Sequence, residues 1–126
     1  MSEQENRVTL ESYFQAFGLH DLDTIDGLLH DEYVEEYPQS GERIRGKQNA
    51  RAVAEQYPGG LPSTVDYSFK LSGDLGVAEM VFDYGGNLVH ICDIVELEDG
   101  KIKRTRAYFG EPFEAPEWRA QWVEKM

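Results

Sequence analysis

The sequence lacks several features that define large classes of protein. Among its 126 residues there is one cysteine, Cys92, which excludes a disulfide within the chain and a zinc site built from several cysteines. No apolar run approaches the length of a membrane-spanning helix. Residues 1–6 are polar and acidic, unlike the apolar core of a secretion signal. We therefore expect a cytoplasmic protein.

Basic residues are also scarce. Lys and Arg total 12 against 24 Asp and Glu, which gives a formal net charge of −12. Such a surface repels nucleic-acid phosphates and anionic membranes, so we expect neither as a partner. The three histidines are scattered without the spacing of metal ligands, so we expect no metal and no other cofactor.

The first half of the chain has the periodicity of helices. Apolar residues recur every three or four positions, which predicts helices over residues 7–17 and 47–57. Between them, Asp21 offers an N-cap for a second, short helix. The segment 31–38 is predicted to be an extended arm, because Pro38 disfavours helical backbone before it. A polar turn is predicted to follow it.

The second half alternates apolar and polar residues, as strands do. Two hairpin turns, at residues 84–87 and 98–101, separate the later segments. The alternation predicts strands over residues 65–71, 78–84, 88–97 and 102–109. Beyond them, Pro116 opens a short helix that carries Trp118 and Trp122.

This order of elements predicts one domain over residues 1–126. Three helices followed by antiparallel hairpins are typical of an α+β fold, with the helices packed on one face of a curved sheet. With 40% hydrophobic residues, the chain can fill one core. A curved sheet partly closed by helices leaves a conical cavity, which is a common site for small molecules.

Asp93 is the most unusual residue of the sequence. It interrupts the apolar run 88–95, which otherwise reads as a buried strand. A buried carboxylate without partners is costly. Asp93 is therefore either a structural residue with hydrogen-bonding partners, or a neutral acid that donates a hydrogen bond to a ligand.

Several segments of the chain resemble the nuclear-transport-factor-2-like (NTF2-like) superfamily. Within it, the chain looks most like the SnoaL-like polyketide cyclases and the steroid Δ-isomerases. The resemblance is carried by residues 13–23, 31–38, 45–47 and 91–111. It implies a cone-shaped, mixed sheet wrapped around three N-terminal helices, the cystatin-like α+β barrel. It does not fix the activity, because this fold hosts enzymes and non-enzymes.

The resemblance also implies positions for catalytic groups. Ketosteroid isomerase holds its substrate oxygen with a tyrosine and a protonated aspartic acid, and an aspartate moves the proton. By resemblance the tyrosine is Tyr13 and the protonated acid is Asp93, while the aspartate base falls on Tyr37. Glu35 lies on the same extended face, about 6–7 Å from Tyr37 along the strand, and is the nearest replacement base. Alternatively, Tyr13 is a core residue and Glu35 a solvated acid.

The expected cavity is lined by apolar and aromatic residues from both halves of the chain. At one of these positions, limonene-epoxide-hydrolase-like relatives carry an acid where this chain has Ala107, which argues against epoxide hydrolysis. Trp118 and Trp122 either cover the cavity mouth or pack on a partner subunit. The predicted ligand-binding residues are Phe17, Val53, Tyr57, Met80, Phe82, Ala107, Phe109 and Trp118.

Alternation assigns another set of residues to the outer face of the sheet. His90 and Asp93 are three positions apart, so an ideal strand places them on opposite faces, and a catalytic His–Asp pair would need a bulge. By resemblance, Arg104, Arg106 and Tyr108 also face outward. Superfamily members commonly dimerise through this face, so we expect a homodimer.

Three functions fit these residues. The first is a small enzyme that isomerises or cyclises an apolar carbonyl compound, with Tyr13 and Asp93 stabilising an enolate. Either Glu35 or a water held by Tyr37 would move the proton. The second is a ligand-binding or structural member of the same fold without turnover. The third is an assembly module that uses an apolar outer sheet face.

Overall fold

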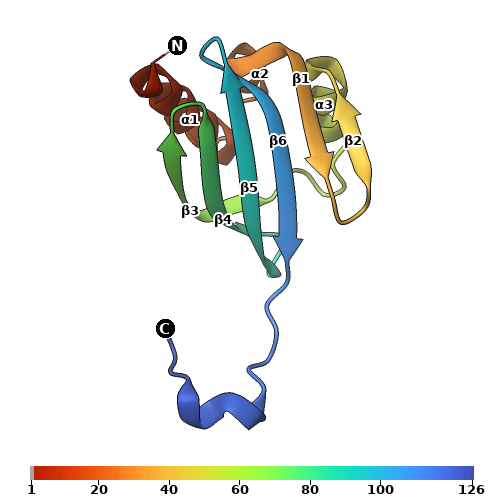
Figure 1. The fold of residues 1–126 in the computed structure, drawn as a ribbon. Helices are drawn as coiled ribbons and strands as arrows, with labels where there is room; N and C mark the ends of the chain where they lie inside the picture. The colour runs from red at the N-terminus through yellow and green to blue at the C-terminus, as the bar shows by residue number, and fades with distance from the viewer. Residues whose placement is uncertain (1) are drawn as a thin grey trace.

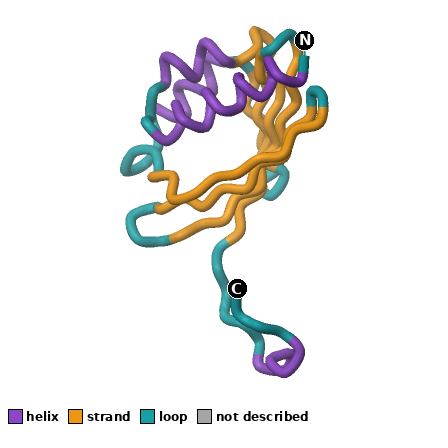
Figure 2. The backbone as a smooth tube through the Cα atoms, turned by 90° about the vertical axis from the view of Figure 1, so that its left-hand side faces the viewer, coloured by secondary structure: helices purple, strands orange, loops and turns teal. Residues whose placement is uncertain are grey.

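The computed structural model of the protein describes residues 2–126 (Figure 1). Its helices are α1 (Glu3–Gly18), α2 (Leu22–Leu28), α3 (Lys47–Glu55) and the 3-10 helix η1 (Glu117–Trp122). Its strands are β1 (Leu29–Tyr37), β2 (Glu42–Arg45), β3 (Ser63–Ser72), β4 (Leu75–Asp83), β5 (Leu88–Glu98) and β6 (Lys101–Gly110). The first three helices lie along one side of the curved sheet (Figure 2), which confirms the predicted α+β fold.

Side-chain caps set the starts of the first two helices. The Ser2 hydroxyl accepts a hydrogen bond from the Glu5 amide at 3.1 Å, so α1 begins before the predicted residue 7. The prediction was late because the first turn is polar and has no apolar period. The Asp21 carboxylate accepts from the Thr24 amide at 3.2 Å, which confirms the predicted cap of α2.

One six-stranded sheet forms the other layer. Its order is β2-β1-β6-β5-β4-β3, in which β1 and β6 are parallel and the other neighbours antiparallel. Over residues 2–126 the edge strands β2 and β3 do not pair, so the sheet is curved but not closed into a barrel. Glu35 is in register with Thr105, and Asp93 with Ala107. All four therefore share one face of the sheet.

Strand β2 corrects the predicted polar turn over residues 39–46. Residues Glu42–Arg45 pair with β1 in antiparallel register. The segment has a single apolar residue, Ile44, so no alternation pointed to a strand. Its backbone pairing with β1, and not side-chain burial, holds it in the sheet.

The core beneath the helices includes Ile102 of β6, which is fully buried in the same cluster as Leu10, Tyr33 and Val95. Replacing Ile102 with valine should lower the free energy of unfolding by about 0.5–1.5 kcal/mol, because it leaves a small void. Urea unfolding followed by circular dichroism measures the change. The same deletion in the half-buried Ile44 should cost less, and equal losses would contradict this account of the core.

The chain beyond β6 leaves the body of the protein. Residues 111–126 extend past the end of β6, with η1 at the far end (Figures 1 and 2). Pro116 precedes η1, as predicted. Among the helices formed by residues 2–126, none is both long enough and apolar enough to cross a membrane.

Candidate functional site

A cavity of about 140 Å³ lies between the helices and the concave face of the sheet. The apolar faces of α1 and of the strands meet around it, so its wall is mainly apolar and aromatic. The ring of Phe17 stacks on that of Phe82 with centroids 5.3 Å apart. The aromatic lining residues are Tyr13, Phe14, Phe17, Tyr33, Tyr37, Tyr57, Phe82, Tyr84 and Phe109.

Strand β1 contributes the acidic group of the cavity. Its alternation points Tyr33, Glu35 and Tyr37 inward together. The Tyr33 hydroxyl donates to Glu35 Oε1 at 2.7 Å and contacts Thr105 Oγ1 at 2.8 Å, while the Tyr37 hydroxyl donates to Glu35 Oε2. Glu35 is thus not a solvated surface acid, since its oxygens accept from the buried phenol of Tyr33 and the half-buried phenol of Tyr37.

Strand β5 places Asp93 against the same space. Its side chain is 6% exposed, and Oδ1 has no hydrogen-bond partner among residues 2–126. Burial, and secondly the charge of Glu35, raise the pKa of Asp93 well above its usual value. At neutral pH the geometry therefore favours a neutral carboxylic acid with a polar group available to a ligand.

Helix α1 adds Tyr13, which is 9% exposed and packs edge-on against Phe14 at 5.3 Å between ring centroids. Burial, then the nearby Asp93 and Glu35, raise the pKa of the Tyr13 phenol well above its usual value. A buried phenol that keeps its proton is a hydrogen-bond donor. Tyr13 and Asp93 are therefore two neutral donors in a cavity that also holds the carboxylate of Glu35.

Most of the predicted lining residues reach this cavity. Phe17, Val53, Tyr57, Met80, Phe82, Ala107 and Phe109 all line it. Trp118 is a correction, because it is 74% exposed on η1 and is not among the described residues that line the cavity. The spacing of the tryptophans indicated a helix but not the direction in which the preceding segment leaves β6.

Thr105 lines the cavity beside Ala107 and Phe109, the set that the resemblance places on this face of the last strand. Sequence reasoning missed Tyr33, although it lies two positions before Glu35 on the same strand face. Arg51 lies at the cavity wall but is occupied by ion pairs to Asp23 at 2.7 Å and Asp26 at 2.6 Å.

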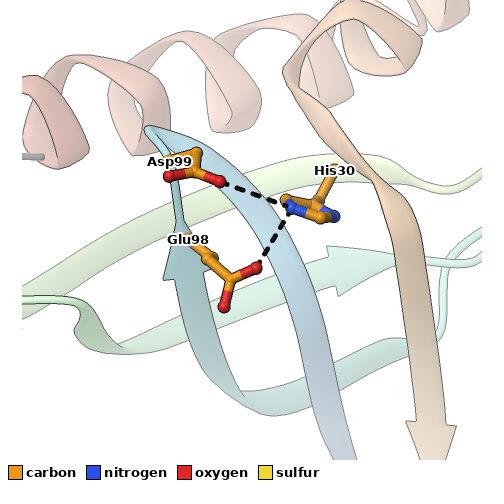
Figure 3. Close-up of side chains that lie close together, drawn as sticks. All are labelled: His30, Glu98 and Asp99. Carbon is orange, nitrogen blue, oxygen red and sulfur yellow. Dashed lines mark ion pairs between the residues drawn. The ribbon is translucent and has the colours of Figure 1, made fainter.

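His30, Glu98 and Asp99 form a cluster outside the cavity that has the composition of a metal site (Figure 3). His30 Nε2 lies 3.2 Å from Glu98 Oε2 and 3.9 Å from Asp99 Oδ2. His30 Nδ1 accepts from the Glu32 amide at 3.0 Å, which requires Nε2 to carry the proton of the neutral ring. The neutral ring in this tautomer has no lone pair at Nε2 for a metal.

The outward-facing predictions also have definite places in the structure. His90 and Cys92 lie on the face opposite Asp93, at a groove that they share with Tyr108. A catalytic His–Asp pair is therefore not formed. Arg106 donates to Glu36 Oε1 at 3.1 Å on that same outer face, and Arg104 donates to Glu96.

Comparisons with known proteins agree with this architecture. The family model for the SnoaL-like domain matches residues 10–105. A search of curated proteins finds no match. An NTF-2 like protein of unknown function from Burkholderia xenovorans has a solved structure that is 34% identical, with a TM-score of 0.87. The match covers 98% of this chain and 97% of that one.

Two further structures are similar in fold. A putative ketosteroid isomerase from Kribbella flavida has 22% identity and a TM-score of 0.89, over 98% of this chain and 91% of that one. An LEH-like epoxide hydrolase from M. tuberculosis has 24% identity and a TM-score of 0.68, over 85% of this chain and 84% of that one. A putative isomerase and an epoxide hydrolase thus share this fold.

Proposed function

The chain belongs to the SnoaL-like domain family, and we propose that it moves a proton on an apolar carbonyl compound, as an isomerase or an aldol-type cyclase. The observation that carries the proposal is the unpartnered Asp93 Oδ1 in a cavity shared with Tyr13 and Glu35. Two neutral donors are suited to a substrate oxygen that gains negative charge. The aromatic wall is suited to an apolar, flat substrate.

In this mechanism each polar residue has one role. Tyr13 and Asp93 donate hydrogen bonds to the carbonyl oxygen of the substrate. Glu35 takes the proton from the neighbouring carbon, so the electron pair of the broken C–H bond forms an enolate. An isomerase returns that proton to another carbon. A cyclase uses the enolate carbon to attack a second carbonyl of the substrate, and the proton goes to the new alkoxide.

Glu35 supplies the base that Tyr37 cannot. The hydroxyls of Tyr33 and Tyr37 hold its two oxygens, so the carboxylate is fixed relative to the cavity. We propose Tyr33 and Tyr37 as positioning residues. Each carboxylate oxygen has two lone pairs and accepts from one phenol, so each keeps a lone pair that can take the substrate proton.

A second candidate function is a ligand-binding protein without turnover, in which the two phenols hold Glu35 as a structural acceptor. In that case the carboxylate accepts from the two tyrosines and takes no proton from the ligand. Tyr13 and Asp93 would then bind the oxygen of a ligand, and no proton would move. The two functions differ in hydrogen exchange with solvent at the carbon next to the carbonyl, because binding alone does not catalyse that exchange.

Deuterium exchange in heavy water tests the proposal directly. We expect the protein to accelerate exchange next to the carbonyl of at least one member of a panel of steroid-like and polyketide-like ketones. Tyr13→Phe and Asp93→Asn should each lower that rate about 10²- to 10³-fold, because each removes a donor to the enolate oxygen. Mass spectrometry of the recovered ketones measures the rate.

A matched control is Tyr67→Phe. Tyr67 stacks on Phe14 outside the cavity lining, and its hydroxyl makes no hydrogen bond within residues 2–126, so the rate should not change. Ketones that bind without any exchange would support the ligand-binding function instead. Absence of binding across the whole panel, with phenolates included, would contradict both functions.

A further inference from the structure

The C-terminal arm, residues 111–126, carries uncovered aromatic side chains. Phe113 is 81% exposed, Trp118 74% and Trp122 70%. Figures 1 and 2 both show the arm continuing beyond the end of β6 instead of folding back along the sheet. Aromatic residues are enriched in the buried centres of protein interfaces, and exposed clusters of them mark interaction sites.

A groove on the outer face of the sheet begins where the arm begins. It is lined by residues that include Val77, Val81 and Tyr108, and it reaches Gly110, the last residue of β6. Val77 is 42% exposed and Tyr108 39%. We call this feature the outer groove. The groove offers an apolar surface on which the exposed aromatic side chains of the arm can pack.

Charge on the same face complements the arm. Four arginines lie on this face beside two acids, Glu36 and Glu96, which pair with three of them and leave an excess of positive charge in a chain whose net charge is −12. The arginines are Arg43, Arg45, Arg104 and Arg106. The arm carries acids at regular intervals in its first half, at Glu111, Glu114 and Glu117. Docking of the arm across this face would bring those acids to the arginines.

We propose that the arm of one copy docks in the outer groove of a second copy, which docks its own arm in return. A second copy supplies both halves of the contact, and a reciprocal pair leaves neither uncovered. Docking of an arm in its own groove would require the chain to reverse at Gly110, and the structure has the arm continuing outward. The B. xenovorans protein also has a counterpart of the arm, because a match over 98% of this chain extends beyond Gly110.

Tryptophan fluorescence reads this contact without a label. The sequence has two tryptophans, and both lie on the arm. We expect emission typical of water-exposed indole in dilute solution, and a shift to shorter wavelength as the concentration rises. The shift should follow the same midpoint as the change from monomer to dimer mass in sedimentation.

A substitution in the outer groove should act on these distant tryptophans. Val77→Glu places a charge in the groove at a residue that is already exposed, so the fold should persist. We expect it to raise the dissociation constant at least about tenfold and to keep the emission at long wavelength. Val8→Glu is the matched control, because Val8 is 56% exposed on α1, away from the groove.

Mixing two variants separates docking between copies from docking within one. The double variant Trp118→Ser, Trp122→Ser has an intact groove and no tryptophan emission. Added to Val77→Glu, it should restore the shift, because its groove can receive the tryptophans of the other chain. Three results would overturn the proposal: a shift that is complete in the monomer, a dimer with unshifted emission, or a Val77→Glu variant that behaves as the original protein.

Discussion

Replacing Glu35 with glutamine should lower the exchange rate next to the substrate carbonyl by about 10²- to 10⁴-fold, the usual contribution of a general base. Glutamine has the same length and keeps an oxygen that accepts from a phenol, but it cannot take a proton at neutral pH. The position of Tyr13 and Asp93 should not change. Phenolate affinity, which depends on those donors, should therefore fall much less than the exchange rate.

Glu32→Gln is the matched control for this experiment. Glu32 lies on the same strand, is exposed and does not line the cavity, so the same change of charge should leave the exchange rate unaltered. A Glu35→Gln variant that exchanges at the original rate would show that another group moves the proton. Equal losses in rate and in phenolate affinity would indicate a disturbed cavity instead of a missing base.

The second large effect concerns stability. The free energy of unfolding of the original protein should fall, relative to Asp93→Asn, as the pH rises above about 4. Burial and the charge of Glu35 raise the pKa of Asp93 in the folded state, so the folded protein keeps a proton that the unfolded chain has released. Each pH unit between the two pKa values costs about 1.4 kcal/mol.

The sign of the effect fixes the shape of the curve. Below the unfolded pKa both states hold the proton, and the stabilising contribution is fully present. Above the folded pKa both states are ionised, and the difference between the two proteins stays constant. Urea unfolding at a series of pH values measures it, with the exposed Asp66→Asn as control. Parallel curves for the original protein and Asp93→Asn would contradict a buried neutral acid.

The same ionisation links stability to activity. An ionised Asp93 has no proton to donate, so the exchange rate should decline over the pH range in which the stability difference levels off. This coincidence distinguishes Asp93 from a residue that only supports the fold. A structural aspartate would give the change in stability without the change in rate.

The sequence predicted the helices and hairpins well, because their signals are local. Asp21 caps α2 as expected, and both predicted hairpin turns join the strands that flank them. The burial of Asp93 followed from its apolar neighbours, and its direction into the cavity was what the family resemblance implied. Strand β2 was missed, since Glu42–Arg45 has no apolar alternation and is defined by its pairing with β1.

The position of Glu35 could not be predicted by local rules alone. The two-residue spacing put it on the same side as Tyr37, but which side faces the cavity depends on how β1 pairs with β6. That pairing is parallel and joins segments far apart in the sequence, so no short turn in the sequence indicates it. The prediction that Trp118 lines the cavity was wrong for a related reason. Helical spacing indicates a helix but not its position relative to the sheet.

The parallel pairing of β1 and β6 has a consequence for how the protein folds. Tyr33 and Thr105, which touch across it, are 72 positions apart, so the loop that joins them closes late and at a high entropic cost. During synthesis, β1 leaves the ribosome with its inner edge unoccupied until the final strand arrives. Refolding should therefore be limited by docking of the last hairpin, and a nascent chain stalled before β6 would hold its helices without a finished pocket.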